Sequence, residues 1–222
     1  MKDCLLFLHG AYSSKHLAYY KKLCRGRFTI AVDGGYRFFE KTDLFPDVLI
    51  GDFDSLKKIP KNLPPKTKVL RFPAEKNQTD AELALEYCFE RKARRIDLVQ
   101  PSAGEPDQFM GNLMLLTLTR RLVAEYNPQV RIVNAGYEIV FLDNTRKIVA
   151  NAVGDTVSIL PLSKKVKYTC RGTAYNVREF KIKQGQSVGL RNRITARKAV
   201  FDITGQAFFI RVYTGDFGQK GA

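Results

Sequence analysis

Short aliphatic and β-branched runs alternate with segments of helical spacing from Cys4 to about residue 142, and this alternation constrains the fold more than any other feature of the 222-residue chain. Strands that alternate with helices are typical of a parallel sheet with helices on its faces. We therefore expect an α/β architecture in this part. The runs are Leu5–Leu8, Phe28–Val32, Val48–Ile50, Val69–Phe72, Ile96–Val99 and Val130–Val133.

Two segments between or after these runs carry the clearest helix patterns. Thr79-Asp80-Ala81-Glu82 has the pattern of a capping box, in which the threonine hydroxyl and the glutamate satisfy free backbone amides. A second helix, from about Gln108 to Glu125, is rich in Leu and Met, and we expect it to be largely buried.

After Asn144 the pattern changes to short alternating segments with Gly or Asn between them, and no helical spacing intervenes. This is typical of a small antiparallel unit, either a sandwich or a partial barrel. We expect residues 1–146 to form the α/β domain and residues 147–222 to form the all-β domain. The segments are Asp155–Leu160, Val166–Cys170, Glu179–Ile182, Ala199–Ile203 and Phe208–Tyr213.

The formal net charge of +15 is concentrated near the carboxyl terminus, since residues 164–222 contain 13 Lys and Arg against 3 Asp and Glu. Such an excess attracts nucleic acid, an anionic membrane surface or a polyphosphate ligand. No recognised nucleic-acid-binding motif accompanies it, so a solvated lysine-rich face is the preferred interpretation and a nucleic-acid partner is not expected.

Cysteine usage and hydropathy both point to a cytoplasmic protein. The apolar run near the amino terminus, Leu5–Leu8, is far shorter than a signal-peptide core or a membrane span. The cysteines show no C-x-x-C pair and no zinc-ligand spacing, so we expect free thiols in a reducing compartment. They are Cys4, Cys24, Cys88 and Cys170.

Acidic residues recur where predicted strands end, and the carboxyl edge of an open α/β sheet is where ligands bind. Asp33-Gly34-Gly35 follows the second run, and its glycines could let a phosphate approach backbone amides, although a plain strand-to-helix turn is the preferred interpretation of these residues taken alone. Asp52 and Asp54 follow the third run. In an extended segment both carboxylates would point to one side, where a divalent cation would offset their repulsion; a solvated loop is the alternative.

Two further junctions add polar residues to the same edge. Asp80 opens the helix after Thr79, where the helix dipole alone explains an acidic residue. Asp107 and Asn112 lie near the start of the second helix, where they could contact a nucleotide, although Asp107 is equally suited to capping that helix. Lys76 could neutralise phosphate charge or be a surface residue. No P-loop, kinase signature or nucleophile elbow is present.

These motifs, in this order, resemble the thiamin pyrophosphokinase family. The likeness rests on D-G-G at 33–35, G-D-F-D-S at 51–55, Thr79-Asp80, and Asp107 with Asn112. It continues through Gly172–Val177, with Tyr175 at an aromatic position, and through Ser187–Asn192.

The resemblance implies transfer of the pyrophosphoryl group from ATP to the hydroxyl of thiamin, which gives thiamin diphosphate and AMP. It implies a homodimer with a Rossmann-like nucleotide domain, a β-sandwich domain, and thiamin at the interface between subunits. Mg²⁺ would lie on Asp52, Asp54 and Asp80, the catalytic residues, with Asp33 nearby and Asp107 and Asn112 beside the nucleotide. Tyr175, Ser187 and Asn192 would face thiamin, where an aromatic ring suits a flat cation.

Three positions depart from the family pattern. Glu105 and Gln108 stand where the family has arginine and histidine, and Arg191 replaces a serine beside the acceptor. Two alternatives therefore stay open: a related pyrophosphokinase with another small alcohol acceptor, such as a pterin, and a non-catalytic nucleotide- or nucleic-acid-binding protein of the same fold.

Overall fold

The computed structural model describes residues 3–56, 59–75, 77–101, 105–122 and 128–215, with backbone only for 119–122. The chain divides into two compact units, Met1–Ala135 and Gly136–Ala222. None of the helices in the described ranges is long and apolar enough to cross a membrane. All cysteines are free thiols, as expected.

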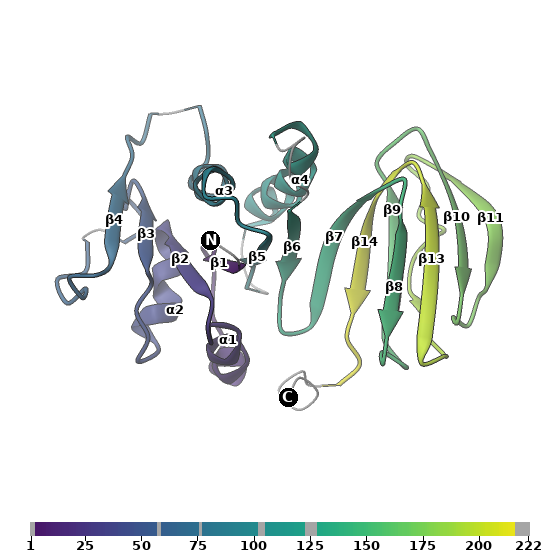
Figure 1. Cartoon of the computed structure of the whole chain (residues 1–222), viewed down its shortest axis with the longest axis horizontal. Coiled ribbons are helices and arrows are strands. Elements are labelled where there is room, and N and C mark those ends of the chain that lie inside the picture. Colours follow the sequence, from purple (N-terminus) through teal and green to yellow (C-terminus); the bar gives the residue numbers. More distant parts are fainter. Residues whose placement is uncertain (1–2, 57–58, 76, 102–104, 123–127, 216–222) are drawn as a thin grey trace. The chain divides into compact units, whose positions relative to one another are not determined.

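The first unit is built on a parallel sheet whose strand order is β6-β5-β1-β2-β3-β4 (Figure 1). The chain adds β2, β3 and β4 on one side of β1 and then crosses to place β5 and β6 on the other, and ligands of open α/β sheets bind at such a reversal. The expected α/β architecture is confirmed. The strands are β1 Asp3–Phe7, β2 Phe28–Val32, β3 Val48–Gly51, β4 Lys68–Arg71, β5 Arg95–Val99 and β6 Gln129–Val133.

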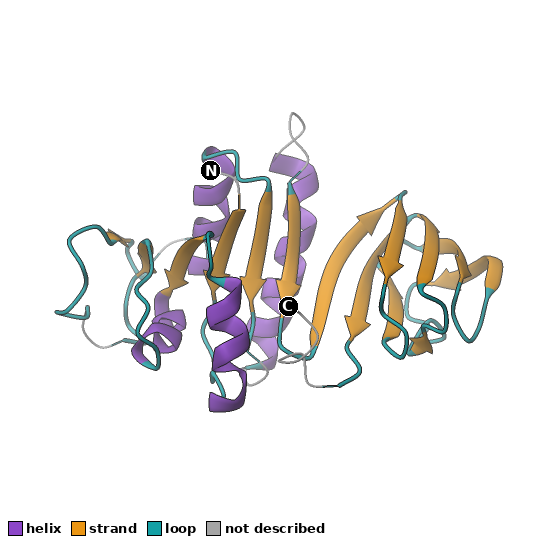
Figure 2. Ribbon diagram, turned by 60° about the horizontal axis from the view of Figure 1, so that its bottom comes forward, coloured by secondary structure: helices purple, strands orange, loops and turns teal. Residues whose placement is uncertain are grey.

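Helices lie on both faces of this sheet (Figure 2). On one face, Leu5 and Phe7 of β1 share a core with Tyr20 of α1 and Phe38 of α2, and the ring centroids of Phe7 and Phe38 are 4.3 Å apart. Helix α3 lies against β1, β2 and β3. The helical segments are the 3₁₀ turns Ser14–His16 and Asp33–Tyr36, α1 Leu17–Leu23, α2 Arg37–Glu40, α3 Asp80–Glu90 and α4 Pro106–Leu122.

The two predicted helices are present, with one difference in burial. Helix α3 begins where its cap predicts, and the backbone amide of Glu82 donates to Oγ1 of Thr79 at 3.2 Å. Helix α4 begins at Pro106, a favoured first helical residue. The expectation that α4 is largely buried is wrong for one side, because Met110 is 52% exposed and Met114 is 44% exposed.

The second unit contains two antiparallel arrays of strands, in the orders β12-β9-β14-β7 and β11-β10-β13-β8. Both arrays contribute to one apolar core, to which β9 gives Ile159, β10 gives Val166, β13 gives Phe201 and β14 gives Phe209. The strands are β7 Tyr137–Asp143, β8 Arg146–Ala150, β9 Thr156–Pro161, β10 Lys165–Arg171, β11 Val177–Lys183, β12 Asn192–Arg193, β13 Lys198–Thr204 and β14 Gln206–Val212.

The division between the units follows Ala135, earlier than the predicted boundary between residues 146 and 147. The reason is β7, which pairs along its whole length with β14, from Tyr137 opposite Val212 to Asp143 opposite Gln206. Its sequence, Y-E-I-V-F-L-D, reads as one more aliphatic run after those of the parallel sheet. Its pairing with β14 is what places β7 in the antiparallel unit.

Candidate active site

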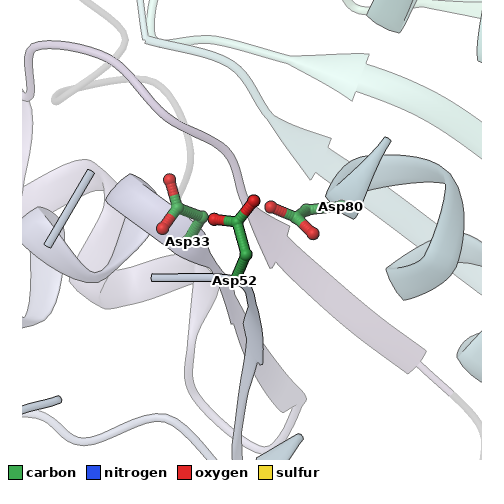
Figure 3. A group of neighbouring side chains, drawn as sticks. All are labelled: Asp33, Asp52 and Asp80. Carbon is green, nitrogen blue, oxygen red and sulfur yellow. The ribbon is translucent and has the colours of Figure 1, made fainter. Parts of the chain in front are cut away.

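Three carboxylates meet at the carboxyl edge of the parallel sheet (Figure 3). Asp33 directly follows β2, Asp52 directly follows β3, and Asp80 is the first residue of α3. One carboxylate oxygen from each residue lies within 4.8 Å of the others. Three like charges at this separation suit a shared divalent cation, because the cation offsets the repulsion that each carboxylate would otherwise feel.

The absence of a side chain at Gly51 allows this approach. Gly51 has a φ of 151°, and a Cβ atom there would lie 3.0 Å from Cβ of Asp33 and 3.2 Å from Oδ2 of Asp80. Both separations are tighter than ordinary van der Waals contact. The last residue of β3 therefore provides room for the carboxylates that follow β2 and open α3.

Asp33 combines a buried carboxylate with an unusual backbone conformation, which are features of a ligand-binding residue. It is 8% exposed and has a φ of 42° in the left-handed region, which few residues other than glycine adopt. Its Oδ1 atom is buried and has no hydrogen-bond partner within the described part of the chain. Burying a carboxylate oxygen without a partner is costly, so the donor set at this edge fits a bound cation.

The group of three differs from the predicted set of Asp52, Asp54 and Asp80. Phe53 has a φ of 69° and is buried, so the segment is not extended and the two aspartates do not project as an extended strand would require. The backbone amide of Asp54 instead donates to Oδ1 of Asp52 at 3.1 Å. Asp33 takes the third place in the group, while Asp54 lines the cavity beside it.

A cavity of about 700 Å³ opens over the group, within the size range of nucleotide and cofactor sites. Most of the site residues predicted for this unit line it. They are Asp33, Asp52, Asp54, Asp80, Asp107 and Asn112. Gln108 also lines it, whereas Glu105 is exposed. Lys76, predicted to neutralise phosphate, lies outside the described residues.

Gly34 and Gly35, predicted to approach a phosphate, have a clear packing role. A Cβ atom on Gly35 would collide with the carbonyl oxygen of Phe7, and one on Gly34 would collide with the ring of His9. The two glycines thus allow the turn after β2 to pack against the end of β1. His9 also lines the cavity, and it was not predicted from the sequence as a site residue.

Asn112 belongs to a buried polar network that the sequence did not indicate. Its Nδ2 atom donates to Oε1 of Gln100 at 2.8 Å, and Nδ2 of Asn134 donates to the main-chain oxygen of Gln100 at 2.8 Å. Gln100 directly follows β5. A polar residue directly after the predicted strand Ile96–Val99, at its carboxyl end, was the pattern that could have identified it.

Two of the predicted thiamin-facing residues in the second unit are joined to each other. The backbone amide of Tyr175 donates to Oδ1 of Asn192 at 3.1 Å, and Nδ2 of Asn192 donates to the carbonyl oxygen of Tyr175 at 2.8 Å. The ring of Tyr175 is left largely in solvent, because the residue is 75% exposed. Ser187 is exposed, and no hydrogen bond joins it to this pair in the part that the structure describes. Arg191 is exposed with a φ of 57°.

Comparisons with known proteins agree on one family. Residues 20–126 match the family model described as thiamin pyrophosphokinase, catalytic domain. A thiamine pyrophosphokinase of Bacillus subtilis is 27% identical over 184 residues, which cover 78% of this chain and 80% of that protein.

Solved structures of the same family share the fold. A Bacillus subtilis thiamine pyrophosphokinase has a TM-score of 0.79 at 22% identity, covering 96% of this chain and 99% of that one. A Geobacillus thermodenitrificans thiamin pyrophosphokinase has a TM-score of 0.77 at 23% identity, covering 97% and 98%. A Candida albicans thiamin pyrophosphokinase has a TM-score of 0.72 at 16% identity, covering 96% and 90%.

Proposed function

We propose that this chain, whose resemblance to the thiamin pyrophosphokinase family the comparisons confirm, transfers the pyrophosphoryl group of ATP to the hydroxyl of thiamin. The products are thiamin diphosphate and AMP. The observation that carries the proposal is the meeting of Asp33, Asp52 and Asp80 in a cavity of nucleotide size.

The chemistry requires positioning and charge neutralisation more than covalent help from the protein. The bond that forms joins the thiamin hydroxyl oxygen to the β-phosphorus of ATP, and the bond that breaks joins this phosphorus to the oxygen that bridges to the α-phosphorus. The hydroxyl proton leaves and AMP departs. Asp33, Asp52 and Asp80 would hold Mg²⁺, which neutralises charge on the phosphates when it is bound. Asp54 lies beside them, facing the same cavity.

The rest of the donor site follows from the same cavity. Asp107 and Asn112 line it and are assigned to the nucleotide. The buried turn at Gly34 and Gly35 is assigned to the phosphates, because its backbone lies beside Asp33 at the sheet edge. In this proposal the parallel sheet is a Rossmann-like nucleotide domain.

The acceptor is assigned to the second unit, in which the two antiparallel arrays form a sandwich. Tyr175, held by Asn192, presents an exposed ring that suits the flat cation of thiamin, and Ser187 completes the proposed set. We propose a cytoplasmic homodimer whose thiamin site lies between subunits. Arg191 would bring a further cation to this region, which favours testing acceptors other than thiamin.

The test is the product formed by the purified protein from ATP and Mg²⁺, with and without thiamin, identified by mass. We expect AMP and thiamin diphosphate in equal amounts only when thiamin is present. AMP formation with a pterin alcohol but not with thiamin would show that the acceptor is not thiamin, while the proposed reaction type would stand. Absence of AMP with every acceptor, from protein that binds ATP, would contradict the proposed activity.

A further inference from the structure

Gln100 is held by hydrogen bonds at three points, one of them to Asn112, which lines the cavity. It directly follows β5 and is only 2% exposed. Its backbone amide donates to the carbonyl oxygen of Val133 at 3.0 Å, and its own carbonyl oxygen accepts from Nδ2 of Asn134 at 2.8 Å. Its side-chain oxygen accepts from Nδ2 of Asn112 at 2.8 Å. The two backbone partners come from one segment, since Val133 ends β6 and Asn134 directly follows it. Gln100 is therefore a fixed point from which the side chain of Asn112 is oriented.

Asn112 projects from α4 and lines the cavity. An asparagine amide carries a donor end and an acceptor end. The donor end faces Gln100, whereas Oδ1 accepts no hydrogen bond from the residues that the structure describes. One N–H of Nδ2 is used by Gln100, and Oδ1 is the acceptor of Asn112 that is left for a hydrogen-bond donor of the ligand.

The acceptor character of Oδ1 distinguishes between the two ends of a nucleoside triphosphate. Phosphate oxygens carry negative charge and only accept hydrogen bonds, so a carbonyl oxygen would repel them. The nucleoside end carries donors, which are the ribose hydroxyls and the exocyclic amine of adenine. The group formed by Asp33, Asp52 and Asp80 suits the phosphates through a cation, and Asn112 suits the nucleoside.

We propose that Gln100 is a positioning residue that turns the amide of Asn112 so that its Oδ1 atom accepts a hydrogen bond from the nucleoside part of the donor nucleotide. The inference rests on the proposed function, in which that nucleotide is ATP. Without Gln100, the amide of Asn112 must be ordered when the ligand binds, and this ordering weakens nucleotide affinity.

The probe is α,β-methylene-ATP with Mg²⁺, an analogue that cannot react, and binding is measured by calorimetry. Gln100→Met keeps the length of the side chain but removes the acceptor, and we expect the Kd to rise about tenfold, the effect of losing one well-made hydrogen bond. The KM for ATP should rise in parallel, while kcat stays within about twofold. Affinity for inorganic triphosphate, which has no nucleoside, should not change.

A double-mutant cycle separates positioning from general loosening. In an Asn112→Ala background, Gln100→Met should leave the Kd unchanged, because the only route of its action has been removed. Asn134→Ala is the graded comparison: it removes one hydrogen bond that fixes the backbone of Gln100 but keeps the contact between Gln100 and Asn112, so it should lower the Tm and weaken nucleotide affinity less than Gln100→Met does. If Gln100→Met fails to fold, Asn112→Ala alone tests the contact, with the same loss for the nucleotide and none for triphosphate.

Three results would overturn the inference: unchanged nucleotide affinity in Gln100→Met or in Asn112→Ala, an equal loss for inorganic triphosphate, or an effect of Gln100→Met that persists in the Asn112→Ala background. Since binding is measured without turnover, failure of the proposed activity is a separate result. If the protein binds the analogue in a Gln100-dependent way but makes no thiamin diphosphate, the proposed activity is contradicted and the positioning role of Gln100 stands.

Discussion

At the scale of single residues, the site depends on backbone positions that a sequence does not reveal. Asp33 and Phe53 both have positive φ values, of 42° and 69°. The sequence indicated that acidic residues gather at this edge, and three of them do. It could not indicate that Phe53 turns the chain into the left-handed region, which removes Asp54 from the group and leaves its third place to Asp33.

Gly51→Ala tests whether close approach of the carboxylates matters. The added Cβ atom would press on Asp33 and Asp80, so we expect turnover to fall about 100-fold and the Mg²⁺ concentration for half-maximal activity to rise. Gly26→Ala is the matched control, because Gly26 also has a positive φ, of 67°, but has no neighbour within 4 Å. It should lose about 1 kcal/mol of stability through backbone strain and keep its Mg²⁺ dependence. Equal kinetics in the two variants would contradict the steric argument.

Comparison of Asp33→Asn with Asp54→Asn tests which carboxylates form the cation site. Loss of a member of the group should raise the Mg²⁺ requirement, so we expect a large rise for Asp33→Asn and for Asp52→Asn. Asp54→Asn should lower kcat with a smaller change in the Mg²⁺ requirement, because Asp54 lies in the cavity but outside the group. Titration of activity with Mg²⁺ at saturating ATP provides the comparison. A larger rise in the Mg²⁺ requirement for Asp54→Asn than for Asp33→Asn would instead support the set predicted from the sequence, Asp52, Asp54 and Asp80.

At the scale of elements, helix α3 connects local sequence to the site. The capping pattern predicts where the helix begins, and this start places Asp80 in the first turn, beside Asp33 and Asp52. A local hydrogen bond determines where the helix begins, so the sequence was sufficient to predict this position. Strand β7 is the contrary example, since its place is determined by pairing with β14, far along the chain. Patterns within β7 could not give the unit boundary.

Thr79→Ala tests this link between helix start and site. Removing the hydroxyl that accepts from the amide of Glu82 should cost about 1 kcal/mol of stability and loosen the first turn of α3. We expect a lower Tm and a Mg²⁺ requirement raised by a few-fold, because Asp80 is in that turn. Thr79→Ser keeps the hydroxyl and serves as the control. A drop in Tm with an unchanged Mg²⁺ requirement would show that the cap supports the fold alone.

At the scale of the whole molecule, one buried carboxylate links three adjacent strands of the parallel sheet, β1, β5 and β6. Asp97 of β5 is fully buried, and it accepts from Arg27 at 2.6 Å and from Arg131 of β6 at 2.6 Å. Arg27 also donates to the carbonyl oxygen of Cys4 in β1 at 2.8 Å. Burial acts to raise the pKa of Asp97, but the hydrogen bond from Arg131 and the charges of Arg131, Arg27 and Arg95 outweigh it, so the pKa lies below its ordinary value of 3.8.

This lowered pKa predicts how stability depends on pH. The folded chain holds the Asp97 proton less tightly than the unfolded chain, so the stabilisation is fully present above about pH 3.9, the unfolded value, and is lost as pH falls through the lower folded value. Asp97→Asn should cost about 3–5 kcal/mol near neutral pH, because it leaves buried arginine charge without its partner, and should reduce the loss of stability in acid. Denaturant unfolding between pH 2 and pH 7 measures both effects.

Asp202 is the control for this prediction. It pairs with Arg146 at an exposed site of the second unit, so Asp202→Asn should leave stability unchanged within error at pH 7. An Asp97→Asn variant that unfolds with the same pH dependence as the wild type would refute the role assigned to the buried carboxylate.

The sequence predicted the two-part organisation and the aspartates that line the cavity because both depend on repeating patterns and on strand ends. It missed His9, which lines the cavity beside Gly34, and Gln100, which contacts the cavity residue Asn112, because each relation depends on a contact with another segment of the chain. A solved thiamine pyrophosphokinase structure shares the fold over 96% of this chain. The central claim that remains to be measured is the transfer of an intact pyrophosphoryl group at the acidic edge.

The most direct measurement follows the label from ATP labelled in its γ-phosphate, with Mg²⁺ and thiamin, in the wild type and in Asp52→Asn. Transfer of both terminal phosphates together predicts that the label appears in thiamin diphosphate, that AMP is the nucleotide left, and that Asp52→Asn forms almost none of this product while keeping the wild-type fold. Label released as inorganic phosphate with ADP left behind, or an undiminished yield of labelled thiamin diphosphate from Asp52→Asn, would contradict the account.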